Sequence, residues 1–396
     1  EELMVNKSLL MIVFFSLTAF LFAQTDDPVI ISYRRNFVRA SISTKIELVT
    51  DASRITTVNM TPLYLDAVSF VLANYQLLGN DSQLMDIAAV AADKTGFYSD
   101  PAAIPSLQKL FAMVTEPRVR IATLKSLAEL TKQARNDVSF LNDWFDSAIT
   151  RSLEKKGEDV RVMIACARSL GSIGAGSSFP VLFRAATSKL DSGIVSEAEK
   201  SLNAISDNYA GNILAIIREK PLYDVYAAFS FAMKREELPV VDKGAIAEAA
   251  FTRAVAHGQT EQRDTLYTSL VKESLDVLGS IGWSQASPAV VQFFYHVQSD
   301  YKTEKADVGM LTSVITCMGG MGTTEAAQAL SIFLGLLNSE TEQKKTYNEQ
   351  VLLSVIQSLG ALGDKSAFDY LLYVGYLDYP ETVKQAARDA LARLEW

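Results

Sequence analysis

One five-residue pattern recurs along this chain and constrains its fold more than any other feature. It is Leu-Gly-Ser-Ile-Gly at Leu170–Gly174 and again at Leu278–Gly282, and near copies occur at Met318–Gly322 and Leu359–Gly363. The glycine pairs of the four copies are Gly171 and Gly174, Gly279 and Gly282, Gly319 and Gly322, and Gly360 and Gly363. Glycine ends a helix readily because it adopts a left-handed backbone without a side-chain clash. The pattern therefore predicts a recurrent joint between helices.

The spacing of these copies predicts a repeat array. Degraded copies that keep the apolar pair without the glycines begin at Leu127, Leu202 and Leu391. Copies lie about 30 to 45 residues apart, the length of a stacked helical hairpin, and one longer interval leaves room for a hidden joint within residues 203–277. A small residue follows each second glycine by four positions, at Ser178, Ala286, Ala326 and Ala367. We therefore predict an all-α fold, an α-solenoid of about eight to ten stacked antiparallel helix pairs.

Composition agrees with a packed helical protein and excludes some classes of partner. The chain has 396 residues, of which 49% are hydrophobic and 21% charged, so it can bury a large core. Its formal net charge is −9. Nucleic acid is not expected as the main partner, because binding phosphates requires a basic face.

The N-terminal residues 1–23 resemble a secretory signal. Lys7 precedes an apolar run, Leu9–Phe22, which is short for a transmembrane helix. A cut after Ala23 would release an exported protein, periplasmic or secreted, beginning at Gln24. The alternative is an uncleaved segment that tethers the protein to a membrane.

Such an exported chain would keep two cysteines, Cys166 and Cys317. They precede joints that are several repeat units apart, and each unit advances the array by roughly 10 Å. A disulfide needs α-carbons within about 7 Å. We expect two buried free thiols.

Residues 24–60 are the least repeat-like part and are interpreted as an N-terminal cap. Tyr33 and Phe37 fit one helical face, with Arg34, Arg35 and Arg39 on its flank. The arginines could form a basic patch for a membrane surface or an acidic partner, although a solvated helix face is the simpler interpretation.

The remainder divides into three parts. Residues 61–206 and 265–396 carry the repeat, whereas residues 207–264 are irregular. The polar composition of residues 338–348 predicts a turn between paired helices. Four tyrosines near the C-terminus are expected to close the core there, or alternatively to form an aromatic patch: Tyr370, Tyr373, Tyr376 and Tyr379.

The repeat resembles a known family. An acidic turn at Asp159, then Val160-Arg161, alanines, and Leu170–Gly174 is similar to HEAT repeats, in particular the short bacterial type. The resemblance covers residues 103–206 and 265–396. It implies a curved α-solenoid that binds other proteins through its inner or edge surface and carries no catalytic residues of its own.

Three arginines are the candidate binding residues. Arg120 and Arg161 occupy equivalent places after a valine, and Arg168 lies seven residues after Arg161, on the same helix face. They could line a groove for an acidic ligand. Alternatively, each pairs with an acid in an adjacent turn and holds the units in register.

The motifs that carry catalysis or metal binding are not found in the sequence. His257 and His296 have no partners at ligand spacing, and no nucleophile elbow or phosphate loop with its lysine occurs. No catalytic residue, metal or cofactor is therefore expected. The favoured interpretation is an exported, non-enzymatic scaffold or protein-binding module of the cell envelope. The alternatives are a membrane-tethered assembly factor, a chromophore-lyase-like enzyme accessory that uses a groove of the solenoid, and a hydrolase hidden in residues 207–264.

Overall fold

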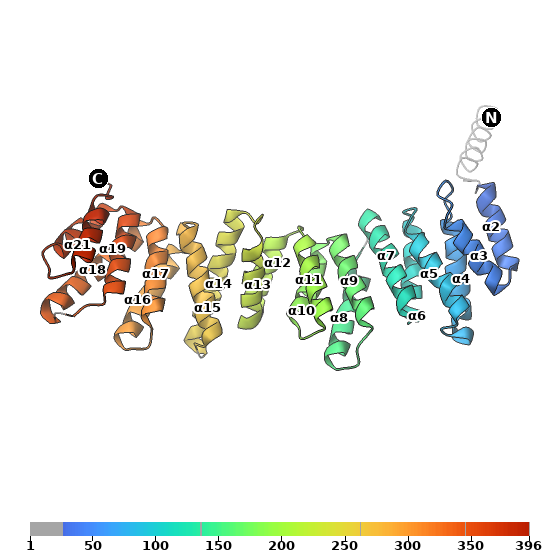
Figure 1. Ribbon diagram of the computed structural model, residues 1–396, viewed down its shortest axis with the longest axis horizontal. Helices are drawn as coiled ribbons and strands as arrows, with labels where there is room; N and C mark the ends of the chain where they lie inside the picture. Colours follow the sequence, from blue (N-terminus) through green and yellow to red (C-terminus); the bar gives the residue numbers. More distant parts are fainter. Residues whose placement is uncertain (1–26, 135–136, 262, 345, 396) are drawn as a thin grey trace, which may run out of the picture. The chain divides into compact units, whose positions relative to one another are not determined.

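The computed structural model describes residues 27–134, 137–261, 263–344 and 346–395. The expected signal segment 1–23 and Trp396 lie outside these residues. Within them the fold is all-α, as the repeat predicts, with twenty α-helices and one isolated β-bridge between Asp364 and Glu395. Within each of its two compact units, neighbouring helices pack on one another in a solenoid-like arrangement (Figure 1). Paired consecutively, the twenty helices give ten pairs, within the predicted number.

The described residues up to Asp207 form one compact unit. Its helices are α2 (Pro28–Arg39), α3 (Ile42–Ala52), α4 (Thr61–Leu78), α5 (Ser82–Thr95), α6 (Ile104–Met113), α7 (Pro117–Ala134), α8 (Ser139–Leu153), α9 (Val160–Ile173), α10 (Phe179–Thr187) and α11 (Ser192–Ala204). The helices pair consecutively from α2, and the second helix of each pair packs on the second helix of the next. Helices α3, α5, α7, α9 and α11 therefore form one row, and the apolar core lies between this row and the first helices.

The described residues from Asn208 onward form the second unit. Its helices are α12 (Tyr209–Glu219), α13 (Leu222–Lys234), α14 (Val240–Thr260), α15 (Thr265–Ser280), α16 (Ser287–Lys302), α17 (Val308–Gly320), α18 (Thr324–Lys344), α19 (Glu349–Leu362), α20 (Phe368–Val374) and α21 (Glu381–Leu391). Here α15, α17, α19 and α21 form the row of second helices. Helix α14 packs on α12, α13 and α15. Residues 203–277 contain no further glycine-bearing pentapeptide, so the hidden joint has a different local sequence.

The two kinds of helix begin in different ways. Most second helices have an acidic or amide N-cap whose side chain accepts a hydrogen bond from the first turn, which stabilises a helix by about 0.5–2 kcal/mol relative to alanine. These N-caps are Asp81, Asp159, Asp191, Asp264, Asp307 and Asn348. Four first helices, α6, α10, α16 and α20, instead follow a single 3₁₀ turn. The small residues expected four positions after each second glycine are all buried: Ser178, Ala286 and Ala367 end three of these turns, and Ala326 lies in the first turn of α18, which follows no 3₁₀ turn.

The two glycines of each pentapeptide have different roles. The second glycine has a left-handed backbone at or just after the helix end, with φ between 65° and 72° at Gly174, Gly282, Gly322 and Gly363. The first glycine lies inside the helix, at Gly171 in α9, Gly279 in α15, Gly319 in α17 and Gly360 in α19. The expectation that both glycines form the joint therefore applies to the second alone.

The first glycine is a point of close approach between neighbouring second helices. A Cβ built on Gly171 would lie 2.8 Å from the Cα of Ser201, and one on Gly279 would lie 2.8 Å from the Cα of Cys317. Each opposing residue is small and belongs to the next second helix. A side chain at the first glycine would push the two helices apart, so tight packing requires glycine here.

The C-terminal end differs from two expectations. Helix α18 continues to Lys344, so most of the predicted turn at residues 338–348 is helical. Asn338 and Thr341 in this stretch are buried, and their side-chain oxygens lie within hydrogen-bonding distance of the Tyr379 hydroxyl, at 3.1 Å and 3.0 Å. Tyr379 thus helps to close the core, but Tyr376 is 78% exposed and does not.

Among the residues that the structure describes, no helix combines the length and hydrophobicity needed to cross a bilayer.

Candidate functional site

A groove of about 590 Å³ runs across the row of second helices in the C-terminal unit. We call it the C-terminal groove. It is formed by α15, α17 and α19, and its lining is rich in small and hydroxyl-bearing side chains. The lining residues are Lys272, Leu275, Asp276, Gly279, Ser280, Thr312, Ser313, Thr316, Cys317, Gly319, Gly320, Ser354, Gln357, Ser358 and Ala361.

Glycines create the floor of this groove. A Cβ on Gly319 would lie 2.7 Å from the Cβ of Ser358, and one on Gly320 would overlap the carbonyl oxygen of Gly279. The backbones of α15 and α17 therefore approach each other without an intervening side chain, and α17 and α19 are separated only by the small side chain of Ser358. The floor consists of backbone and small side chains.

Most hydroxyl groups of the groove donate within the protein and keep acceptor capacity. Ser280 donates to the carbonyl oxygen of Val277 at 2.9 Å, and Ser313 donates to that of Gly309 at 2.8 Å. A hydroxyl that donates one hydrogen bond retains lone pairs that can accept others. The groove thus offers acceptors to the N–H groups of a bound chain.

Three exposed polar residues occupy the same position in successive second helices of the C-terminal unit. Asp276, Thr316 and Gln357 each lie three positions before the first glycine of their copy. All three line the groove, one on each of α15, α17 and α19. Gln357 can donate and accept hydrogen bonds, as a peptide group does. The row presents one carboxylate and two neutral polar groups.

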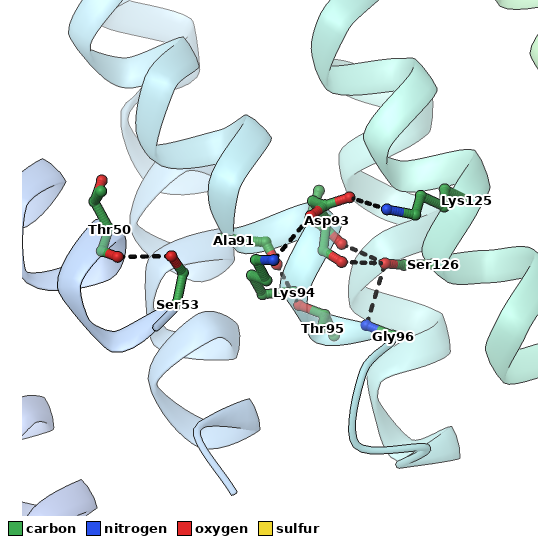
Figure 2. A network of polar contacts seen from close by, with 10 residues as sticks. Thr50, Ser53, Ala91, Asp93, Lys94, Thr95, Gly96, Lys125 and Ser126 are labelled. Atoms are coloured by element: carbon green, nitrogen blue, oxygen red, sulfur yellow. Dashed lines mark hydrogen bonds and ion pairs between the residues drawn. The ribbon is translucent and has the colours of Figure 1, made fainter. Parts of the chain in front are cut away.

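The equivalent positions in the N-terminal unit are charged and paired. Asp93 lies three residues before Gly96, and Lys125 holds the same place on α7. The Lys125 ammonium binds the Asp93 carboxylate at 2.7 Å (Figure 2). Burial acts to raise the pKa of Asp93, but the hydrogen bond from Lys125 and the nearby lysine charges outweigh it, so this pKa is lowered.

A buried serine joins α5 to α7 beneath this ion pair. The Ser126 hydroxyl lies 2.5 Å from the carbonyl oxygen of Ala92 and accepts a hydrogen bond from the backbone N–H of Gly96 at 3.1 Å (Figure 2). Ser169 and Ser358 make the same kind of bond to the preceding second helix, with carbonyl oxygens at 3.2 Å and 3.1 Å. These serines fix the register between neighbouring units.

Arg120 is committed to packing. Its side chain is 8% exposed and donates to the carbonyl oxygen of Val114 at 2.9 Å and to Glu158 at 2.7 Å. Its guanidinium also lies 5.3 Å from the ring centroid of Phe111. Glu158 belongs to the turn of the next pair, so Arg120 ties α7 to the α8–α9 turn.

The other two arginines are exposed but already paired. Arg161 binds Asp159, the N-cap of its own helix, at 2.7 Å, and this hydrogen bond lowers the pKa of Asp159. Arg168 binds both oxygens of Glu197 on α11, at 2.9 Å and 3.0 Å, and lowers the pKa of Glu197. The structure does not gather the three arginines into one cluster. Each has an acidic partner with which an acidic ligand would compete.

One of the three predicted arginines, Arg168, occupies the same place in its repeat as residues that line the C-terminal groove. It lies three positions before Gly171, just as Thr316 and Gln357 lie three positions before Gly319 and Gly360. The sequence analysis selected Arg168 for its charge. It missed Thr316 and Gln357 because threonine and glutamine form no distinctive motif. The signal that could have identified them is their constant distance of three residues from the first glycine of each copy.

The cysteines are buried, and the described residues contain no metal-binding cluster. Cys166 and Cys317 are both free and buried, as predicted. Burial raises the pKa of Cys317 to about 12 and that of Cys166 further. Within the described ranges no group of three or more His, Cys, Asp and Glu side chains could hold a metal ion.

Comparisons with known proteins do not identify a family for this chain. No protein-family model matches the chain, and no curated protein matches it either. The resemblance to HEAT repeats therefore stays a prediction from the sequence pattern.

Proposed function

We propose that this protein is an exported, non-catalytic, HEAT-like scaffold of the cell envelope that binds a segment of another protein in the C-terminal groove. The observation that carries the proposal is the groove itself. It lies across three successive second helices and is floored by backbone. The signal-like residues 1–23 support the exported location.

The dimensions of the groove favour an extended peptide segment. Three neighbouring helices are separated by two interaxial spacings, roughly 20 Å in all. An extended chain covers that length with about six residues. The groove is open and lined by hydroxyl groups, whereas pockets for small ligands are concave and mostly apolar. Side chains such as Thr316 and Gln357 match the hydrogen-bonding groups of a peptide backbone.

The test blocks the groove with a substitution and compares the proteins that the variant and the wild type capture. Gln357→Arg places a long side chain over the groove, and Gln292→Arg makes the same substitution at an exposed position on first helix α16. Circular dichroism first shows that both variants keep wild-type helicity. Each is then used to capture proteins from envelope extract, with quantification by mass spectrometry.

We expect Gln292→Arg to retain the wild-type set of captured proteins and Gln357→Arg to lose at least one of them. An identical set for all three proteins would overturn binding in the groove. The mass of the mature protein tests the location separately. A chain that begins at Gln24 supports export with cleavage, and an intact N-terminal segment supports a tether.

A further inference from the structure

Helix α2, the first of the described chain, has an exposed face of mixed apolar and basic character. Ile30 and Phe37 are buried on one side of α2. Next to this buried side lie four residues spaced as one helical stripe, which we call the α2 face: Ile31, Arg35, Val38 and Arg39. Val38 is 73% exposed and Ile31 is 46% exposed. Apolar side chains this exposed on a helix that also carries basic ones are typical of a surface that meets a partner.

The positive charge of the α2 face is not neutralised within the described residues. Arg34 binds Asp66 on α4 at 2.7 Å, but no ion pair engages Arg35 or Arg39. Residues 27–54 contain five basic and three acidic side chains, although the whole chain has a net charge of −9. This end of the protein is therefore locally basic and suited to an anionic partner.

A hollow of about 510 Å³ lies beside the α2 face. Arg34, Arg35 and Val38 line it from α2, and Asp66 and Phe70 line it from α4. The Asp66 carboxylate is paired with Arg34, and the Lys45 ammonium, only 4% exposed, donates to backbone carbonyl oxygens that include that of Ala40 at 2.9 Å. Arg35 is therefore the basic group that an anionic headgroup in the hollow would meet.

The sequence before α2 indicates what kind of partner lies nearby. The apolar run Leu9–Phe22 ends six residues before Pro28, the first residue of α2. Six residues span at most roughly 20 Å. Whenever this run contacts a bilayer, the first residue of α2 is within that distance of the headgroups, and Arg39 lies roughly 16 Å further along the helix. A bilayer also accommodates apolar and basic side chains side by side, with the apolar groups among the acyl chains and the basic groups at the phosphates.

We propose that the α2 face docks on an anionic membrane surface, with Ile31 and Val38 in the interface and Arg35 and Arg39 on lipid phosphates. The proposal is independent of binding in the C-terminal groove. An acidic protein is the competing occupant of the same face. A membrane fits better because the apolar and basic side chains alternate along one stripe and follow an apolar segment.

The experiment uses the full chain and a fluorescent reporter on α2. Both native cysteines are buried, so Val38→Cys supplies an accessible thiol for an environment-sensitive dye. Val29→Cys, exposed on another side of α2, is the matched control. The labelled proteins are mixed with vesicles of phosphatidylcholine alone, or of phosphatidylcholine with phosphatidylglycerol. Because the apolar run could bind vesicles by itself, the dye position distinguishes docking of α2 from tethering alone.

With the mixed vesicles we expect a blue shift of the dye at position 38 and little change at position 29. In the Val38→Cys background, Arg35→Gln with Arg39→Gln should weaken the response roughly thirtyfold, at about fivefold for each basic residue. Arg218→Gln with Lys220→Gln removes the same charge from the C-terminal end of α12 and the residue after it, and should leave the response unchanged. Protein bound to vesicles without a shift at position 38, or an arginine variant that responds like its parent, would overturn the proposal. So would a shift produced by an acidic protein and not by vesicles.

Discussion

Substitution of Gly320 tests whether close backbone contact holds the second helices together. A Cβ at Gly320 would overlap the carbonyl oxygen of Gly279 and lie 2.8 Å from its carbonyl carbon. All the crowded atoms belong to the backbone of α15, so no side chain can rotate away. Overpacking costs about 1–3 kcal/mol, and the upper value applies to a rigid neighbour. Alanine recovers at most about 1 kcal/mol of helix preference. We expect Gly320→Ala to lose about 2 kcal/mol of stability.

Two measurements check this value. Thermal unfolding should shift down by roughly 4–8 °C for a unit of this size. Reaction of Cys317 with a thiol reagent reports local opening of α17, because the backbone of Cys317 packs against Gly279 and its thiol is buried. A loss of 2 kcal/mol should accelerate that reaction roughly thirtyfold. Cys166, in the other unit, should react at its wild-type rate.

The control is Ala361→Gly, at the equivalent position of the next copy. This change relieves no contact and should cost about 0.5–1 kcal/mol through backbone entropy. Gly320→Ala and Ala361→Gly should therefore both lower stability, although one replaces glycine by alanine and the other replaces alanine by glycine. Gly320→Ala with an unchanged or higher melting temperature would refute close packing of α15 and α17.

Three further predictions concern residues selected from the sequence, with stability measured by urea unfolding. Gly174→Ala should cost about 1–2 kcal/mol because φ is 72° there, and Gly174→Asn should cost less; equal costs would contradict a left-handed joint. Arg120→Met should cost about 2–3 kcal/mol, less than for a fully buried pair because Glu158 is 23% exposed; a loss below that of an exposed pair would contradict a packing role. Arg168→Gln should cost at most about 1 kcal/mol. The lowered pKa of Glu197 makes this contribution present at neutral pH and lost as pH falls from 4.5 through the native value; a difference that persists in stronger acid would contradict the pairing.

The sequence by itself determined the local features of this protein. The period of the pentapeptide, the second glycines and the acidic N-caps each act within one turn and its flanking residues. They fix where helices start and stop, and hence an all-α repeat. Their effect depends on backbone preference and hydrogen bonds between near neighbours in sequence, so no knowledge of packing is needed to infer them.

Tertiary structure decided every feature that depends on the register between units. The role of Gly171 became clear only because Ser201, thirty residues later, packs against it. Arg120 appeared equivalent to Arg161 in sequence, yet Arg120 is buried against Glu158 of the next pair while Arg161 stays on its own helix end. The groove likewise exists because α15, α17 and α19 approach closely enough to expose backbone between small side chains. Such contacts join residues about 30 to 45 positions apart, and small rotations of a helix change which side chains meet, so the pattern within one repeat does not specify them.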